Sequence, residues 1–168
     1  IGLGFLLKNY WTMEVELNSA SISLYTNREN NEFDIDNNRI NSFNMNASLD
    51  LIDNLLLPSN GGIINISFKQ ADKAINSQKN YHWYKIESDL YWTTNKHTTR
   101  LFLYNHYGDS NIPLYLQTFN KGSNFLSGFA VNQIQGYSVA LMRLEYRYKY
   151  KNDIYFHLIS NNVINCII

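Results

Sequence analysis

The sequence predicts an all-β protein, an antiparallel up-and-down β-barrel that spans a membrane. Two observations predict this fold. Apolar and polar residues alternate with a period of two in segment after segment, and short and long connections follow one another along the chain. Period-two alternation gives a strand one apolar and one polar face. Membrane barrels join such strands by short turns at one end and by long loops at the other.

Five alternating segments lie in the first part of the chain. The first two, Tyr10–Leu17 and Ala20–Tyr25, are expected to be joined by a short turn at Asn18 and Ser19. The third is 42–51, the fourth is 64–69 and the fifth is 84–92. The apolar residues of the third to fifth segments that we expect to face lipid are Phe43, Met45, Leu49, Ile64, Ile66, Phe68, Ile86 and Leu90.

Three further segments complete an expected set of eight strands. Thr99–Asn105 is less regular, and its outward face stays open, because Leu101 and Leu103 oppose Phe102 and Tyr104. Residues 139–148 alternate best, and 154–162 form the last segment. In 139–148 we expect Ala140, Met142 and Leu144 to face lipid, opposite Arg143, Glu145 and Arg147.

The connections divide into two kinds. Short ones are expected at Asn18–Ser19, 57–60, 95–96 and 151–153, and long ones at 27–39, 72–80 and 106–135. We interpret residues 1–168 as a single barrel domain in which 106–135 is a long outer loop. Because the chain starts at Ile1 without a signal segment, we also interpret it as a fragment whose export signal precedes it.

Composition excludes several classes of partner and site. With 14 basic and 14 acidic residues the formal charge is zero, so the composition as a whole shows no electrostatic footprint of the kind that binds nucleic acid or anionic lipid. Cys166 is the only cysteine, so the chain cannot form an internal disulfide or a cysteine-based metal site. No apolar run is long enough for a membrane-spanning helix, which leaves strands as the means of crossing.

A soluble β-sandwich is the alternative fold, in which one apolar face packs on a second sheet. The barrel is favoured because charges such as Glu87 lie at strand centres, while Tyr and Trp lie near strand ends. The lumen would then be lined by Glu14, Asn44, Lys69, Glu87, Arg143 and Arg147. In this arrangement Leu144→Arg should impair folding in a membrane by ~2–4 kcal/mol, and Val139→Arg should cost less.

The chain offers little for catalysis. The four histidines, His82, His97, His106 and His157, lack metal-ligand spacing, and Gly-x-Ser-x-Gly is absent. We therefore expect no enzymatic activity, no metal, no cofactor and no small-molecule substrate. Arg143, Glu145 and Arg147 can form either a ladder of lumen salt bridges or a docking site for a loop, and the sequence leaves both open.

Two motifs stand out within residues 120–162, GSNFLSGF at 122–129 and GYSVALMRLEYRYKY at 136–150. With these motifs, residues 120–162 resemble the C-terminal barrel of the bacterial surface antigen, or BamA-like, outer-membrane superfamily. LPSNGG at 57–62 is similar to a proline-containing periplasmic turn of that superfamily, with Pro58, Gly61 and Gly62. The resemblance implies about half of a 16-stranded barrel.

The resemblance also implies a loop lock, in which an Arg-Gly-aromatic motif of the long outer loop folds into the lumen. Gly128 and Phe129 match that motif, but Ser127 replaces its arginine. Arg143, Glu145 and Arg147 would be the partners on the following strand. The replacement favours a divergent branch, and the barrel of the patatin-like phospholipase autotransporters is the branch that 124–150 resembles, with the lipase domain upstream.

The leading functional hypothesis is therefore an outer-membrane barrel domain that anchors, translocates or assembles polypeptide. Its partners would be outer-membrane lipid and a polypeptide passenger or fused upstream domain, without nucleic acid. One alternative is a soluble extracellular β-sandwich that binds a glycan or a protein through its Tyr- and Trp-rich surface. Another is a passive porin or receptor barrel.

Overall fold

The structure is a computed structural model that describes residues 1–22, 38–113, 117–119, 135–151 and 154–167. The described residues contain ten β-strands and one short 3-10 helix. The strands are β1 Gly2–Leu7, β2 Trp11–Ile22, β3 Asn38–Asp50, β4 Gly61–Ala71, β5 Tyr81–Thr94, β6 His97–Gly108, β7 Thr118–Phe119, β8 Gln135–Gly136, β9 Ser138–Lys151 and β10 Ile154–Ile167, and the 3-10 helix η1 is Lys73–Ile75.

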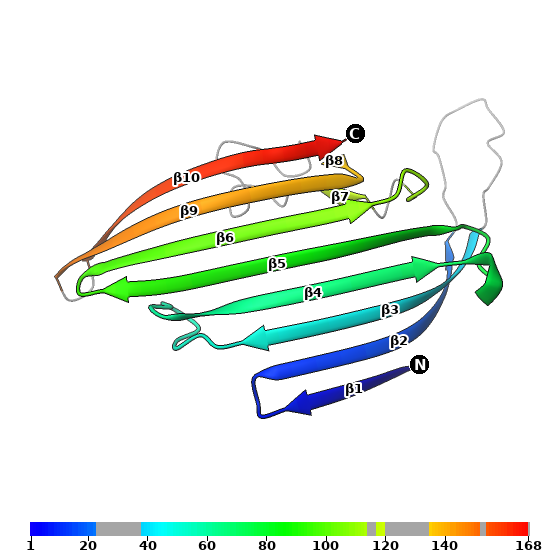
Figure 1. Ribbon diagram of the computed structural model, residues 1–168, viewed down its shortest axis with the longest axis horizontal. Coiled ribbons are helices and arrows are strands. Elements are labelled where there is room, and N and C mark those ends of the chain that lie inside the picture. Colours follow the sequence, from blue (N-terminus) through cyan, green and yellow to red (C-terminus); the bar gives the residue numbers. More distant parts are fainter. Residues whose placement is uncertain (23–37, 114–116, 120–134, 152–153, 168) are drawn as a thin grey trace, which may run out of the picture.

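Eight of the strands form one sheet in the order β1-β2-β3-β4-β5-β6-β9-β10, and each pairs antiparallel with its neighbours (Figure 1). The two residues of β7 pair with those of β8 in a separate small ribbon. This is the all-β, up-and-down meander that the alternation predicts, in the open form of a partial barrel. A sandwich would need a second large sheet against the apolar face, and the described residues contain none.

The first two predicted strands are one strand, so the predicted turn at Asn18 and Ser19 is wrong. Both residues continue the ladder, opposite Ser42 and Asn41 of β3. The apolar residues change face here: Leu17 is on the same face as Phe43, whereas Ala20 pairs with Ile40 on the other face. The apolar residues before Asn18 and those after Ser19 lie on opposite faces of the same strand. In the sequence this break in the alternation looked like a turn between two strands.

The strand that the sequence prediction missed is β1, so the count of eight is reached by a different set. All six of its residues are exposed, and it pairs with β2 from Gly2↔Glu16 to Leu7↔Trp11. The turn that follows is sharp, because Lys8 and Asn9 both adopt positive φ (52° and 60°). Asparagine tolerates that conformation well, which makes this a turn the sequence could have revealed.

The link between β3 and β4 is longer than predicted. The predicted strand ended at Leu51 and the predicted turn was 57–60, but β3 ends at Asp50 and β4 starts at Gly61. The link of residues 51–60 is thus no shorter than 72–80 between β4 and β5. The links predicted at 95–96 and 151–153 are short, since Thr94 pairs with His97 and Lys151 with Ile154.

Successive links lie at alternate ends of the sheet (Figure 1). The end where β1 and β2, β3 and β4, β5 and β6, and β9 and β10 are joined is called here the short-link end, although its link 51–60 is no shorter than 72–80. The other end, where β2 and β3, β4 and β5, and β6 and β9 are joined, is called the long-link end. The predicted loop 106–135 starts later than expected, because β6 runs to Gly108.

The register assigns each residue of the sheet to one of two faces. All eleven residues predicted to face lipid lie on one face, where Leu90, Leu101 and Leu144 form one row. Leu101 and Leu103 belong to this face, which settles the question that the sequence left open for their strand. We call it the outer face, and contact of these residues with lipid stays a prediction.

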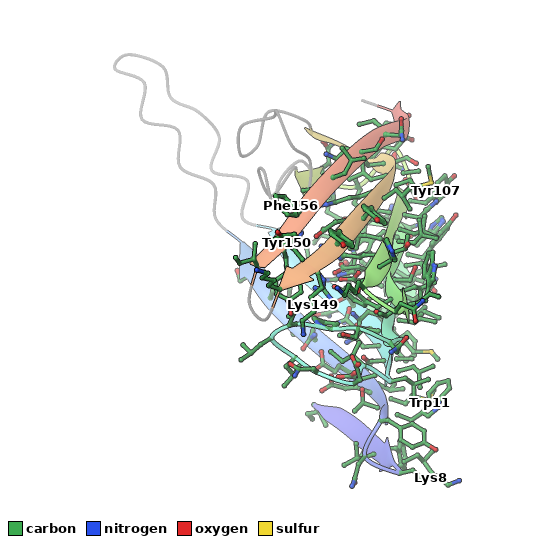
Figure 2. All side chains as sticks on the ribbon, turned by 90° about the vertical axis from the view of Figure 1, so that its left-hand side faces the viewer. Lys8, Trp11, Tyr107, Lys149, Tyr150 and Phe156 are labelled. Carbon is green, nitrogen blue, oxygen red and sulfur yellow. The ribbon has the colours of Figure 1, made fainter. Side chains whose placement is uncertain are left out.

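The polar face is the more enclosed one. Along β6, Phe102, Tyr104 and His106 are buried, whereas Leu103 and Tyr107 on the outer face are 37% and 42% exposed. A flat single sheet would expose both faces alike, so the sheet curls toward its polar side, which we call the inner face. In Figure 2, which faces the short-link end, Trp11 and Tyr107 project from the outer face.

At the long-link end the inner face is apolar instead of polar. Ile112, which follows β6, is buried against Ile40, Ala71 and Tyr81 of three different strands. A second cluster, Phe102, Tyr104, Val139 and Leu141, lies on the same face of β6 and β9. Val139 is only 3% exposed, so an arginine there would be enclosed, and the expectation that it costs less than an arginine at Leu144 stays a prediction.

Helices long and apolar enough to cross a membrane are absent from the described part of the chain.

Candidate functional site on the inner face

The site is a network of charged side chains on the inner face of β5, β6, β9 and β10, centred on Glu145. The register places Arg100 opposite both Tyr91 and Glu145, so three strands bring their side chains to one place. Arg100 donates two hydrogen bonds to Asp89, from Nε to Oδ1 and from Nη2 to Oδ2, each 2.7 Å long. Two parallel bonds of this kind fix both groups, because the planar guanidinium matches the carboxylate.

Glu145 accepts bonds from three other side chains. Its Oε2 lies 3.2 Å from Nη1 of Arg100 and 3.3 Å from Nη2 of Arg143, and its Oε1 lies 2.9 Å from Nδ1 of His157. The Glu145 side chain is 13% exposed. A carboxylate this enclosed needs such partners, since leaving it without them costs several kcal/mol.

Aromatic rings lie against two of the arginines, Arg100 and Arg147. The Arg100 guanidinium lies 5.5 Å from the ring centre of Tyr91, and Tyr91 donates a 3.0 Å hydrogen bond to Oδ2 of Asp89. Arg147 lies 5.5 Å from the ring of Tyr155. Rings at these distances stabilise a cation by their negative faces. The network is therefore held by rings as well as by ion pairs.

Arg147 has a different role from the other members. Its Nη2 donates a hydrogen bond to the backbone oxygen of Pro58, in the link between β3 and β4. Thr93 holds the same link, since its Oγ1 donates to Ser59 O at 2.7 Å and its backbone N–H donates to Oδ1 of Asn60 at 3.0 Å. The link 51–60 consequently crosses the inner face at the short-link end and reaches β9. We call it the strap.

Glycine is required where the strap returns to the sheet. Gly61 has φ +97°, and a Cβ there would lie 1.9 Å from the backbone oxygen of Leu51. At Gly62 a Cβ would lie 2.6 Å from Cδ2 of Leu90. No side chain fits at Gly61 without moving backbone. The predicted turn residues Pro58, Gly61 and Gly62 therefore build the end of the strap and its junction with β4.

The structure describes the β9 residues of the predicted loop lock but not the loop motif. Arg143, Glu145 and Arg147 lie together on β9, as the alternation predicts, whereas Ser127, Gly128 and Phe129 lie outside the described residues. Of the ladder that the sequence allowed, the structure contains the Arg143–Glu145 pair, whereas Arg147 binds the backbone of Pro58, and Arg100 and Asp89 supply the remaining pairs. Docking of the loop stays a prediction.

Three members of the network were not picked out from the sequence. These are Asp89 of β5, Arg100 of β6 and His157 of β10. The missing information was the register. Pairing Asp89 with Phe102, and Arg100 with Glu145, could not be read from either strand alone.

The other histidines lie apart. His82 is 3.5 Å from Asp109, His97 contacts Tyr146, and His106 is buried near Trp83. Among the described residues, no three His, Cys, Asp or Glu side chains gather as metal ligands.

Comparison with known proteins identifies the family. A profile of the Omp85 superfamily domain matches residues 1–158, which include seven of the eight strands of the sheet and the start of β10. The chain belongs to the Omp85 superfamily. Omp85 domains are characteristic of bacterial outer-membrane β-barrels, so the outer face described above is that of an outer-membrane protein. No curated protein matches the chain.

Membership of Omp85 also gives the general function. The superfamily consists of non-enzymatic machinery that inserts or translocates proteins, and its members interact with polypeptide substrates in the outer membrane. The inner-face network and the strap therefore belong to an Omp85 domain.

Proposed function

We propose that this chain is the part of an Omp85 barrel that holds the long link after β6 inside the lumen, and that the whole barrel anchors, translocates or assembles a polypeptide. The supporting observation is Ile112. It follows β6 and is buried on the inner face, against side chains of β3, β4 and β5. The backbone agrees, since the N–H groups of Gly108 and Asp109 donate to Tyr137 and His82 at 2.6 and 3.1 Å. The chain beyond β6 thus turns inward.

The seat for the lock would be the network on β9. If residues 127–129 dock there, a disulfide should form between Gly128→Cys and Arg143→Cys in a Cys166→Ser background. The matched control joins Gly128→Cys to Asn46→Cys, on the inner face of β3. Cross-linking of the first pair only, in the full-length protein in membranes, is expected. Equal yields from the two pairs would refute the docking.

Reconstitution tests the function itself. Full-length protein in lipid vesicles should raise the protease-protected fraction of an unfolded outer-membrane polypeptide above that of empty vesicles. Ion conductance without any effect on the polypeptide would overturn the proposal in favour of the passive porin or receptor barrel. The lipid and polypeptide partners would be identified in the same vesicles by cross-linking.

Within the superfamily we propose the patatin-like autotransporter branch, with the chain forming about half of a 16-stranded barrel. The support is the similarity of residues 124–150 to that branch, together with Ser127 in place of arginine. The complete coding sequence tests the assignment to this branch. A Gly-x-Ser-x-Gly domain before the barrel is expected, and repeated periplasmic transport domains in its place would refute the assignment.

A further inference from the structure

Each tight turn at the short-link end carries a lysine. Lys8 lies between β1 and β2, Lys96 between β5 and β6, and Lys151 ends β9 before the turn to β10. All three are exposed. The hairpins of Lys96 and Lys151 are neighbours in the sheet, whereas β3 and β4 separate the hairpin of Lys8 from them, so the three lysines are spaced in a row along one end of the wall (Figure 1). We call this row the lysine rim.

Aromatic residues of the outer face accompany the rim. Beside Lys8, the side chains of Leu7, Tyr10 and Trp11 line a hollow of about 420 Å³. Trp92 is 46% exposed two residues before the end of β5. The Lys151 ammonium lies 5.7 Å from the ring centre of Tyr150, which packs edge-on against Phe156 at 6.1 Å (Figure 2).

A β-bulge turns the last of these lysines outward. Lys149 pairs with Tyr155 on the inner face, but Lys151 pairs with Ile154, so the register shifts by one residue at Tyr150. Lys149 lies over Tyr155, on the inner side, while Lys151 joins Tyr150 and Phe156 on the outer side. Without the bulge both lysines would lie on the inner face.

The positive charge of the rim is not neutralised within the described part of the chain. No ion pair there joins Lys8, Lys96 or Lys151 to a carboxylate. The described carboxylates nearest this end bind the strap instead: Asp50 accepts from the N–H of Ile52 at 3.1 Å, and Asp53 from that of Ser59 at 2.8 Å. The rim therefore has cations available for an anionic partner.

We propose that the lysine rim binds the headgroups of anionic phospholipids in the leaflet next to the short-link end. Tyr and Trp settle at the interface of a bilayer, and lysines just beyond them reach the phosphate groups. The order along the outer face fits this surface, since apolar Leu144 and Leu158 are followed by Tyr150 and Phe156 and then by Lys151. Clustered lysines at this depth attract anionic lipid.

Native tryptophans report on the rim. Trp11 and Trp92 lie on the outer face near it, and Trp83→Phe removes the inner-face fluorophore. Full-length protein is placed in vesicles that contain a fixed fraction of either brominated phosphatidylglycerol or brominated phosphatidylcholine. Enrichment of the anionic lipid should give at least about two-fold stronger quenching by the former, and 1 M salt should remove the difference.

Replacing lysines by glutamine tests whether the rim, and not another part of the surface, binds the anionic lipid. The pair Lys8→Gln and Lys96→Gln flanks the two tryptophans, and it should abolish the excess quenching by the anionic lipid. The matched control, Lys73→Gln with Lys79→Gln, lies at the long-link end and should leave it unchanged. Equal quenching by the two lipids in the unaltered protein, or an excess that survives the first pair, would overturn the proposal.

Discussion

The inner face is built in two different ways along the sheet. Across β2, β3 and β4 it is mostly neutral, with Asn and Ser side chains such as Ser48, which donates a 2.6 Å hydrogen bond to Asn65. Across β5, β6, β9 and β10 it is charged and cross-linked through Glu145. We call these the amide region and the charged region.

The difference between the amide region and the charged region indicates which side chains hold the strands of a single sheet in place. Amides and hydroxyls can exchange protein partners for water at little cost, so the amide region tolerates hydration. Enclosed charges cannot, and they hold their strands in one arrangement. The two regions share the same backbone ladder, so substitutions on their inner faces should differ in effect mainly through the side chains.

The largest contrast is expected for removal of a carboxylate. Glu145→Ala leaves Arg100 and Arg143 facing each other without their shared acceptor, and should lower the free energy of unfolding by about 3 kcal/mol. Glu14→Ala in the amide region removes an exposed carboxylate near Glu16 and should change it by less than about 0.5 kcal/mol. Urea unfolding of the full-length protein in vesicles measures both, and similar losses would break the comparison.

The next contrast is between faces. Leu144, 45% exposed on the outer face, should not tolerate arginine, and Leu144→Arg is expected to cost ~2–4 kcal/mol near the bilayer midplane. Asn46→Arg on the inner face of the amide region should cost less than about 1 kcal/mol, because the side chain stays hydrated. Folding yield into vesicles at a series of urea concentrations tests the pair. A larger loss at Asn46 would reverse the assignment of faces.

A smaller effect is expected where the strap meets β4. Gly61→Ala forces a Cβ onto the Leu51 backbone oxygen at positive φ and should cost about 1–3 kcal/mol. Gly4→Ala is the control, since its Cβ would meet nothing closer than Met13 O at 3.9 Å, and a change under about 0.5 kcal/mol is expected. Thermal unfolding of both variants in the same detergent decides. A neutral Gly61→Ala would show that the strap adapts.

The smallest expected effect is a loss of stability of the strap at low pH. Backbone N–H groups of Ser59 and Asn60 donate to Asp53 and lower its pKa below the ordinary 3.8. A lowered folded-state pKa means that the carboxylate stabilises the strap above pH 3.8, and that this contribution disappears as the pH falls through the folded value. Cleavage within 51–60 by an acid protease should rise in that range. Asp53→Asn should flatten the rise, and an unchanged profile would contradict the role of the carboxylate.

Sequence patterns predicted the strands better than their connections. Alternation in residues 42–50 and 139–148 is uninterrupted, and both segments are single strands with the predicted faces. It failed at Ala20 and Ile22, because the inner face becomes apolar near the long-link end and the pattern changes phase within a strand. The glycines of Gly2–Leu7 also hid β1, since glycine gives no polar face to alternate with Leu3 and Phe5.

The candidate site was predictable only in part. The row Arg143, Glu145 and Arg147 follows from spacing within one strand, whereas its partners Arg100 and His157 depend on register between strands. The attachment of the strap to β9 was not predictable either, because nothing in the sequence near Pro58 indicates a contact with Arg147. Contacts between residues far apart in the chain are set by the whole sheet, and local patterns do not contain them.

The hydrogen bond between Arg147 and Pro58 also makes the strap a reporter of the register of β9. The two residues are 89 positions apart, whereas Thr93, the other attachment of the strap, lies on β5 next to β4. The contact with Thr93 needs only β4 and β5 in place, but the contact with Arg147 also needs β6 and β9 in the sheet. A shift of β9 by one residue would turn Arg147 to the outer face and release the strap from β9.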